Sequence, residues 1–562
     1  MARHQSKSKI KERFVLTLPL RYERWQRDKL DKIFITGNRL KNTLIAKYKK
    51  ALEQMTATRR WKEIQKEICR IKQFYQKDLE ELELLREKQK NLHKKGRRLS
   101  DEEQTELKRL QEKEKECNEA LAPWYQSRHE MLKQYHMSEY DFMAVMTKIR
   151  KPYKKQIGST VAQNIASDVW RIFAAYLFNN GEEIRFSKWS QFLSLEGKNN
   201  TNLRFSQKDM TLKVGKIVTL AVKTSRRDPY RYEEEALKRK VCYCRIIRKA
   251  YPEGWRYFVQ LVLEGVPPVK AKSGDEKAFH AIGSGRVGLD IGTQTLAVCA
   301  DDAVRLEELA PGAQNLQDEL RRVNRAMDRS RRAMNPEMFD EKGEIIDKDK
   351  LPPSCLNRHG ERAWKNSKRY LKLVRHRRYL YRKQADLRKH RHHKLANELL
   401  PLGDAFYIEE MDFRALAKRM KETKKNKKGK TISKKRFGKS IANKAPALFV
   451  STLKQKVLNA GGSFISIDTW KAKASQYNHM TGKYTKKKLS QRVNIMPDGK
   501  KIQRDLYSAF LIQHTNDDLE SFQTTELERD YPSFVTYHDM EMQKLQQIAR
   551  HLPSSMGVKQ IA

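Results

Sequence analysis

The spacing of apolar residues changes near residue 205, and this change constrains the fold more than any other feature of the sequence. From about 22 to 180, apolar side chains recur every three or four residues, which predicts helices with one buried face. From about 205 to 265 they alternate with polar residues, which predicts strands. A chain of 562 residues with two such regions, and nearly three hundred residues after them, is long enough for several domains.

The alternating region contains three predicted strands, at 211–224, 240–249 and 254–266, separated by polar residues or by glycine and proline. The segment 11–20 alternates in the same way. We expect it to complete a small β-barrel with these strands, so that the helices between them form an insertion. Within the helical region, Ser100 and Glu103 have the spacing of a capping box, which predicts the start of a helix.

Charge indicates the kind of partner. The chain has 118 Lys and Arg against 69 Asp and Glu, a formal net charge of +49. A protein that neutralises many phosphates gains affinity by releasing counterions, so this excess favours a nucleic acid as partner. The alternative, a highly charged protein that binds no polyanion, is disfavoured by the size of the excess and by its distribution along the whole chain.

Other classes of protein are disfavoured by what the sequence lacks. No apolar run approaches the roughly 20 residues that cross a bilayer. The basic start of the chain has no apolar stretch typical of a secretory signal, so we expect an intracellular protein. The six cysteines include no C-x-x-C pair, which disfavours a disulfide framework and a cysteine-rich zinc site.

The segment GLDIGTQTLAV, residues 288–298, places Asp290 between two glycines in a strand-like run. Such a turn suits either a phosphate loop, as in sugar kinases, or a metal-binding carboxylate, as in RNase H-like nucleases. A kinase loop would lie near the start of the chain and would need later glycine-rich turns, but the only adjacent glycines after Asp290 are Gly461 and Gly462, with no second phosphate loop around them. We therefore favour the nuclease, with Gly292 expected to allow the tight turn.

A nuclease that uses two metal ions needs further carboxylates at structural edges. The predicted strand at 404–413 contains Glu409 and Glu410, and Asp505 stands at the start of a predicted helix over 502–512. Strand alternation shows only that Glu409 and Glu410 face opposite sides. The choice between them is left open by the residue pattern alone.

These three segments resemble, in order and spacing, the RuvC motifs of the TnpB nucleases and of the compact type V CRISPR effectors. The resemblance selects Glu409 over Glu410. It implies a RuvC-type site in which Asp290, Glu409 and Asp505 are the catalytic residues and hold two Mg²⁺ ions. The likeness is firm over 286–512 and looser before that.

The resemblance also implies a multidomain α/β architecture, with a helical recognition domain inserted in a small β-barrel (wedge) domain and an RNase H-like RuvC domain carrying a small inserted subdomain. The expected boundaries are 1–22 for the first barrel strand, 23–195 for the recognition domain, 196–280 for the rest of the barrel and a linker, 281–472 for the first part of the nuclease domain with a basic loop at 419–436, 473–503 for the target-nucleic-acid-binding insert, and 504–562 for the third motif and the tail.

The insert at 473–503 departs from the family. The family's zinc ribbon has two C-x-x-C pairs, whereas this chain has Asn478, Thr481, Ile495 and Asp498 at those positions. His479 alone cannot build a tetrahedral zinc site. We therefore expect a metal-free hairpin and no structural zinc.

The basic helix predicted over 365–394 is expected to contact phosphates, with a packing side that includes Leu371 and Leu380. Its histidines His390, His392 and His393 are expected to face phosphates rather than a metal. The candidate nucleic-acid contacts are Lys368, Arg369, Arg375, Arg377, Arg378, Arg382, Lys389 and Arg504.

The function that the resemblance implies is RNA-guided cleavage of DNA. The partners would be a guide RNA and a double-stranded DNA target, bound as an RNA–DNA heteroduplex with a displaced strand, next to a short flanking motif read by the protein. The protein would then be cytoplasmic in a prokaryote and associated with the nucleoid when bound to DNA. Two alternatives remain: a guide-dependent DNA binder that does not cut, and an RNase H-fold transposase or resolvase that needs no guide.

Overall fold

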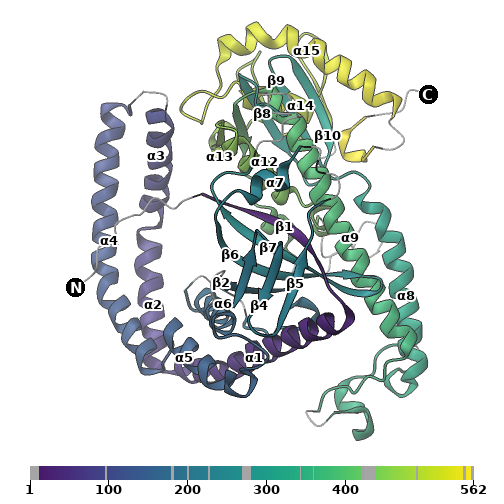
Figure 1. Ribbon diagram of the computed structural model, residues 1–562. Helices are drawn as coiled ribbons and strands as arrows, with labels where there is room; N and C mark the ends of the chain where they lie inside the picture. Colours follow the sequence, from purple (N-terminus) through teal and green to yellow (C-terminus); the bar gives the residue numbers. More distant parts are fainter. Residues whose placement is uncertain are drawn as a thin grey trace. The chain divides into compact units, whose positions relative to one another are not determined.

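The computed structural model divides the chain into two compact units (Figure 1), residues 1–249 with 256–268, and residues 250–255 with 269–562. The residues that the structure describes are 12–94, 98–178, 181, 183–198, 202–225, 228, 230–268, 280–341, 343–357, 360–419, 422, 437–488, 491–548 and 552–558. Among these residues, no helix combines the length and the apolar character needed to cross a membrane.

The first unit is built on a seven-stranded antiparallel sheet of order β2-β6-β7-β1-β5-β4-β3. The strands are β1 (Arg13–Arg21), β2 (Ser194–Lys198), β3 (Leu203–Ser206), β4 (Thr211–Val214), β5 (Val218–Val222), β6 (Val241–Tyr251) and β7 (Gly254–Glu264). The two edge strands β2 and β3 contact each other, so the sheet is a nearly closed barrel. Leu16, Leu18, Leu212, Leu220 and Leu261 are buried inside this unit.

The strands of this sheet differ from the prediction in two respects. The stretch 211–224 is a hairpin of β4 and β5, not one strand, because Gly215 turns the chain with a φ of +53° that favours glycine. The short strands β2 and β3 were not predicted, because four or five residues carry too little alternation to stand out.

The helices of the first unit follow β1 in the chain, and β1 itself lies in the sheet between β7 and β5. They are α1 (Arg24–Ala57), α2 (Arg59–Phe74), α3 (Gln76–Lys94), α4 (Asp101–Gln134), α5 (Glu139–Arg150) and α6 (Ser159–Phe178), with α7 (Tyr232–Leu237) before β6. Ser100 caps α4 through a capping box with Glu103, which confirms that prediction. The helices α1 to α6 are thus inserted between two strands of one sheet.

The second unit has a five-stranded sheet of order β10-β9-β8-β11-β12, in which β10, β9 and β8 are antiparallel and β8, β11 and β12 are parallel. The strands are β8 (Arg286–Ile291), β9 (Thr295–Ala300), β10 (Ala303–Glu308), β11 (Ala405–Glu409) and β12 (Ser463–Ile467). Two small hairpins follow, β13 (Tyr477–Asn478) with β14 (Lys483–Tyr484), and β15 (Val493–Ile495) with β16 (Lys501–Gln503).

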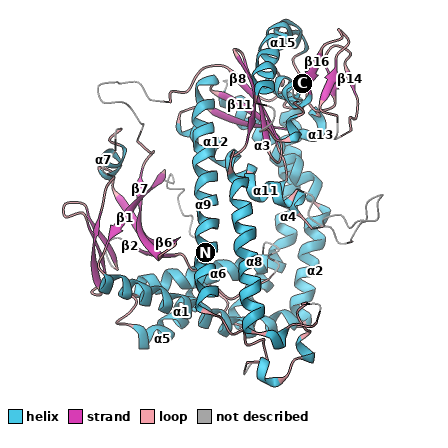
Figure 2. Cartoon of the chain, turned by 90° about the vertical axis from the view of Figure 1, so that its right-hand side faces the viewer, coloured by secondary structure: helices cyan, strands magenta, loops and turns pink. Residues whose placement is uncertain are grey.

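Helices cover both faces of this sheet. On one face, Leu289 and Phe406 pack with residues of α9 and α12; on the other, Tyr407 packs with residues of α14 and α15. A second long helix, α8, lies against α9 (Figure 2). The helices of this unit are α8 (Leu316–Met334), α9 (Lys368–Leu399), α10 (Phe413–Ala417), α11 (Gly438–Lys444), α12 (Pro446–Asn459), α13 (Thr469–Ala472), α14 (Arg504–Gln513) and α15 (Thr524–Gln547).

Candidate active site

Asp290 and Glu409 lie side by side at the ends of neighbouring parallel strands. The ladder between β8 and β11 pairs Leu289 with Ile408, so the next residue on each strand is Asp290 and Glu409. Leu289 and Ile408 belong to the core under α9 and α12. Because side chains alternate along a strand, Asp290 and Glu409 point to the opposite face, the one that α14 covers.

Helix α14 brings the third carboxylate to the same place. It packs directly on Gly288, where a Cβ atom would lie 2.0 Å from the carbonyl oxygen of Ala509. Gly288 and Asp290 share a strand face about 6.6 Å apart. Asp505 precedes Ala509 by one turn, about 6 Å along the helix. Arg286, at the start of β8, donates to the carbonyl of Thr515 just past the end of α14. The start of α14 therefore lies over the end of β8 and brings Asp505 to Asp290.

The electrostatics of the cluster agree with this geometry. Burial raises the pKa of Asp290 well above its ordinary value, and the charges of Asp505 and Glu409 raise it further, while Arg504 and the Ser508 hydroxyl oppose the rise. Burial raises the pKa of Glu409 to about 7, and the backbone N–H of Ala474, which donates to Glu409 Oε1 at 3.3 Å, opposes this. Three carboxylates thus converge in surroundings that disfavour their combined negative charge.

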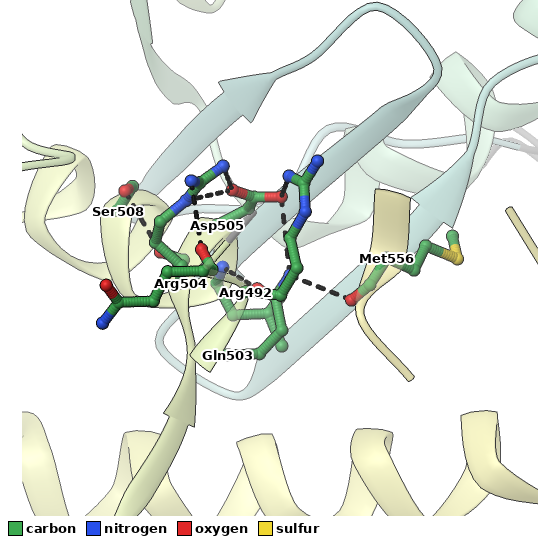
Figure 3. A network of polar contacts seen from close by, with 8 residues as sticks. Arg492, Gln503, Arg504, Asp505, Ser508 and Met556 are labelled. Atoms are coloured by element: carbon green, nitrogen blue, oxygen red, sulfur yellow. Dashed lines mark hydrogen bonds and ion pairs between the residues drawn. The ribbon is translucent and has the colours of Figure 1, made fainter. Parts of the chain in front are cut away.

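Two arginine side chains flank the carboxylate of Asp505 (Figure 3). Arg504 donates to Asp505 Oδ1 from Nε at 3.0 Å and from Nη2 at 2.9 Å. Arg492 Nη1 lies 3.9 Å from the other oxygen, Oδ2, and Gln503 Nε2 lies 3.4 Å from it. Gln503 also accepts a hydrogen bond from the backbone of Leu506 and so caps α14. The orientation of Asp505 is therefore fixed by three side chains.

The donors of the cluster suit a hard divalent cation. Asp290, Glu409 and Asp505 offer only carboxylate oxygens, the ligands that Mg²⁺ prefers, and a cation would relieve the repulsion that raises the pKa of Asp290. Among the described residues, however, no group of three His, Cys, Asp or Glu side chains is already arranged as a metal site. Asp505 Oδ1 is engaged by Arg504 instead.

Glu410 and Gly292, which stand next to the motif carboxylates in the sequence, do not take part in the carboxylate cluster. Glu410 is exposed and lies beyond the end of β11. Gly292 has a φ outside the left-handed region, so the expected need for glycine in this turn is wrong. Gly288 is the glycine that the site requires, because a side chain there would collide with α14.

The structure places the predicted nucleic-acid contacts in two groups. Lys368, Arg369, Arg375 and Lys389 are exposed along α9. The candidate contacts of the second group are half-buried and have partners within the protein. Arg377 donates a hydrogen bond to Asn324, Arg382 forms an ion pair with Asp386, and Arg504 forms an ion pair with Asp505. Arg378 is half-buried as well.

Two predictions for side chains of α9 were wrong, those for His392 and Leu371. His392 is fully buried, packed edge-on against Phe449, and therefore cannot face phosphates. Leu371 is exposed rather than part of the packing side, which Tyr370 and Leu380 form with α8. His392 falls on the sheet side because α9 continues beyond α8 to cover the strands.

The insert at 473–503 consists of the two small hairpins. Asn478 is in β13 and Ile495 is in β15, while Thr481 and Asp498 lie in the turns. His479 is buried, and its Nδ1 lies 2.7 Å from the hydroxyl of Tyr507 on α14. An aromatic contact with Tyr531 on α15 also holds it. His479 thus contributes to the packing of the insert on the sheet unit.

Sequence reasoning missed several residues that support the cluster. Ser508 could have been found, because it lies one turn after Asp505 on the same helix face. Arg492 and Ala474 reach the site from separate loops, and nothing in their local sequence indicates it. The basic loop predicted at 419–436 lies outside the described residues, apart from Arg419 and Glu422.

No family model and no curated protein matches the chain. Among solved structures, it is similar to a chain of "Cryo-EM structure of the Cas12f1-sgRNA-target DNA complex", with 12% identity, a TM-score of 0.38, and coverage of 90% of this chain and 99% of that one. It is also similar to a chain of "Cryo-EM structure of CRISPR-Cas12f Ternary Complex", with 11% identity, a TM-score of 0.20, and coverage of 89% and 98%.

Proposed function

We propose that the protein is an RNA-guided DNA endonuclease whose active site is formed by Asp290, Glu409 and Asp505. The observation that carries the proposal is the convergence of these carboxylates at the ends of β8 and β11 and the start of α14. Structural ion pairs also gather charges, but three partly buried like charges in one place cost stability and are retained where function needs them.

In this proposal, Asp290, Glu409 and Asp505 hold Mg²⁺, which supplies activation of water and stabilisation of the leaving oxygen when bound. Glu409 is kept in place by the Ala474 N–H. Arg504 and Arg492 orient Asp505 and add positive charge where a phosphate would enter. The closed packing of α14 on Gly288 fixes the distance between the strand carboxylate and the helix carboxylate.

The guide RNA and the DNA target belong to the proposal through the sequence resemblance and the net charge of +49. The exposed cations of α9 are the candidates for contact with the nucleic-acid backbone. No zinc takes part, because the positions of the ribbon ligands carry Asn478, Thr481, Ile495 and Asp498.

The test begins with purification of the full chain and sequencing of the RNA that accompanies it. The complex is then incubated with a plasmid that carries the matching target beside a randomised flank, with Mg²⁺ or with EDTA. The proposal predicts cleavage that needs Mg²⁺, the RNA and a restricted set of flanks. Cleavage that persists after the RNA is removed would indicate a resolvase-like enzyme. Guide-dependent binding without any cleavage would indicate a DNA-binding regulator.

A further inference from the structure

Trp470 is an aromatic side chain displayed at the rim of the carboxylate cluster. Its side chain is 86% exposed, and among the described residues no large hydrophobic side chain is more exposed. A single exposed apolar residue is ordinary on a protein surface, but tryptophan is enriched at binding interfaces, so an exposed one held beside a polar site is a candidate for binding. The position of Trp470 relative to the cluster shows what it would bind.

The short helix α13 ties Trp470 to the segment that carries Glu409. Trp470 follows Ile467 by three residues, and Ile467 pairs with Glu409 across the parallel ladder. Just before Trp470 in the chain, the hydroxyl of Thr469 donates a hydrogen bond to the carbonyl of Glu410 at 3.2 Å. Four residues after Trp470, the N–H of Ala474 donates to Glu409 Oε1 at 3.3 Å.

The backbone that carries Trp470 is held by several contacts. Asp468 accepts hydrogen bonds from the N–H groups of Trp470 and Lys471, at 2.8 and 3.2 Å, and thereby caps α13. Lys471 forms an ion pair of 2.7 Å with Glu520. Ala472 and Ala474 are completely buried. The exposed ring is therefore presented by a fixed piece of backbone beside the active site.

From these observations we infer that Trp470 is a stacking platform for a base of the single strand whose backbone enters the carboxylate cluster. This inference rests on the proposed nuclease function. Carboxylates repel a phosphate backbone, so a strand near them needs a source of affinity that does not depend on its charge. Every base has a π-face, and stacking on an aromatic ring supplies such affinity without selecting a sequence. Trp470 is thus a positioning residue, not a catalytic one.

The first test measures binding of a single-stranded 12-mer that contains 2-aminopurine, in EDTA, to the full chain with its accompanying RNA. Trp470→Ala is expected to weaken binding about tenfold at every salt concentration and to remove the fluorescence quenching caused by stacking. The slope of affinity against salt should stay the same, because the substitution leaves every phosphate contact in place. Trp470→Phe and Trp470→Tyr should restore most of the affinity and the quenching.

Tyr140→Ala is the matched control, because Tyr140 is 84% exposed on α5 in the other unit and should leave both readouts unchanged. Thermal unfolding should not distinguish Trp470→Ala from the unsubstituted protein. Equal affinity and equal quenching in Trp470→Ala would overturn the inference. So would a change of oligomeric state in Trp470→Ala with unchanged oligonucleotide binding, because Trp470 would then bind another protein copy.

A second test separates this inference from the proposed function. With a plasmid target opened by an unpaired bubble at the cutting position, Trp470→Ala should raise KM about tenfold with a smaller change in kcat. Cleavage with unchanged KM would contradict the platform and leave the nuclease assignment intact. Absence of cleavage in the unsubstituted protein would contradict the nuclease assignment, while the oligonucleotide measurement would still decide whether Trp470 stacks on bases.

Discussion

Glu409 and Glu410 are adjacent in the chain but occupy opposite environments. Glu409 is held by the Ala474 N–H beside Asp290, whereas Glu410 is exposed. We expect Glu409→Gln to reduce DNA cleavage at least about a hundredfold, because it removes one of the three charges that the site gathers. Glu410→Gln is the matched control and should stay within about twofold. Equal losses in a plasmid-cleavage assay would refute the assignment of Glu409.

His479 provides a prediction about pH. Burial, together with the neighbouring His514 and opposed by Asp498, lowers its pKa from 6.5 to about 4. Below pH 6.5 the unfolded chain takes up a proton that the folded chain does not, so the free energy of unfolding should decrease as the pH falls from 6.5 to about 4. The decrease from this group is on the order of 3 kcal/mol.

Urea unfolding at pH 5 and pH 7.5 measures this effect. The His479→Asn variant should lose stability overall, yet its stability should depend less on pH than that of the unsubstituted chain. The same pH dependence in both proteins would show that His479 is protonated equally in the folded and unfolded chains.

At the scale of elements, the docking of α14 on β8 determines the geometry of the site. Gly288→Ala would place a Cβ atom 2.0 Å from the Ala509 carbonyl, so α14 must move and carry Asp505 away from Asp290. We expect a loss of about 3 kcal/mol or more in unfolding free energy, by overpacking, and a loss of cleavage. In the control Gly292→Ala, the nearest atom is the Thr295 side-chain oxygen at 3.2 Å, which needs to shift by only a few tenths of an ångström, so both properties should change much less than in Gly288→Ala.

The exposed cations of α9 lead to a prediction about salt. Separate replacement of Lys368, Arg369, Arg375 and Lys389 by alanine should weaken nucleic-acid binding and reduce the salt slope by about 0.9 for each phosphate that the protein no longer neutralises. Lys394 lies on the same helix and pairs with Glu398 at 3.5 Å, so Lys394→Ala should change the slope less. Filter binding over a range of NaCl concentrations measures the slopes. Unchanged slopes in all four variants would remove α9 from the interface.

The sequence predicted the local features of these elements and missed the non-local ones. The short apolar runs of β8 and β11 and the apolar face of α14 were sufficient to place each candidate carboxylate near the end of its element. The contact between Gly288 and Ala509 joins distant parts of the chain, and no periodic pattern indicates it. The same is true of Arg492, which reaches Asp505 from a loop. Short strands such as β2 were missed because their alternation is too brief.

At the scale of the whole molecule, a carboxylate cluster and two nearby arginines occur in a chain with a net charge of +49. The charge indicates the class of partner, and the motif resemblance indicates RNA guidance. The choice of Glu409 over Glu410 came from the motif resemblance, because strand alternation only separates their faces. The geometry places Glu409 beside Asp290.

The most direct test of the central claim is plasmid cleavage by the Asp290→Asn variant, purified with its RNA and assayed in Mg²⁺ beside the unsubstituted complex. The side chain keeps its size and loses its charge, so guide-dependent DNA binding should remain within about threefold. Cleavage should fall at least about a thousandfold, because Asp290 is central to the site. Cleavage at the unsubstituted rate, with intact DNA binding, would show that the carboxylate cluster is not the nuclease centre.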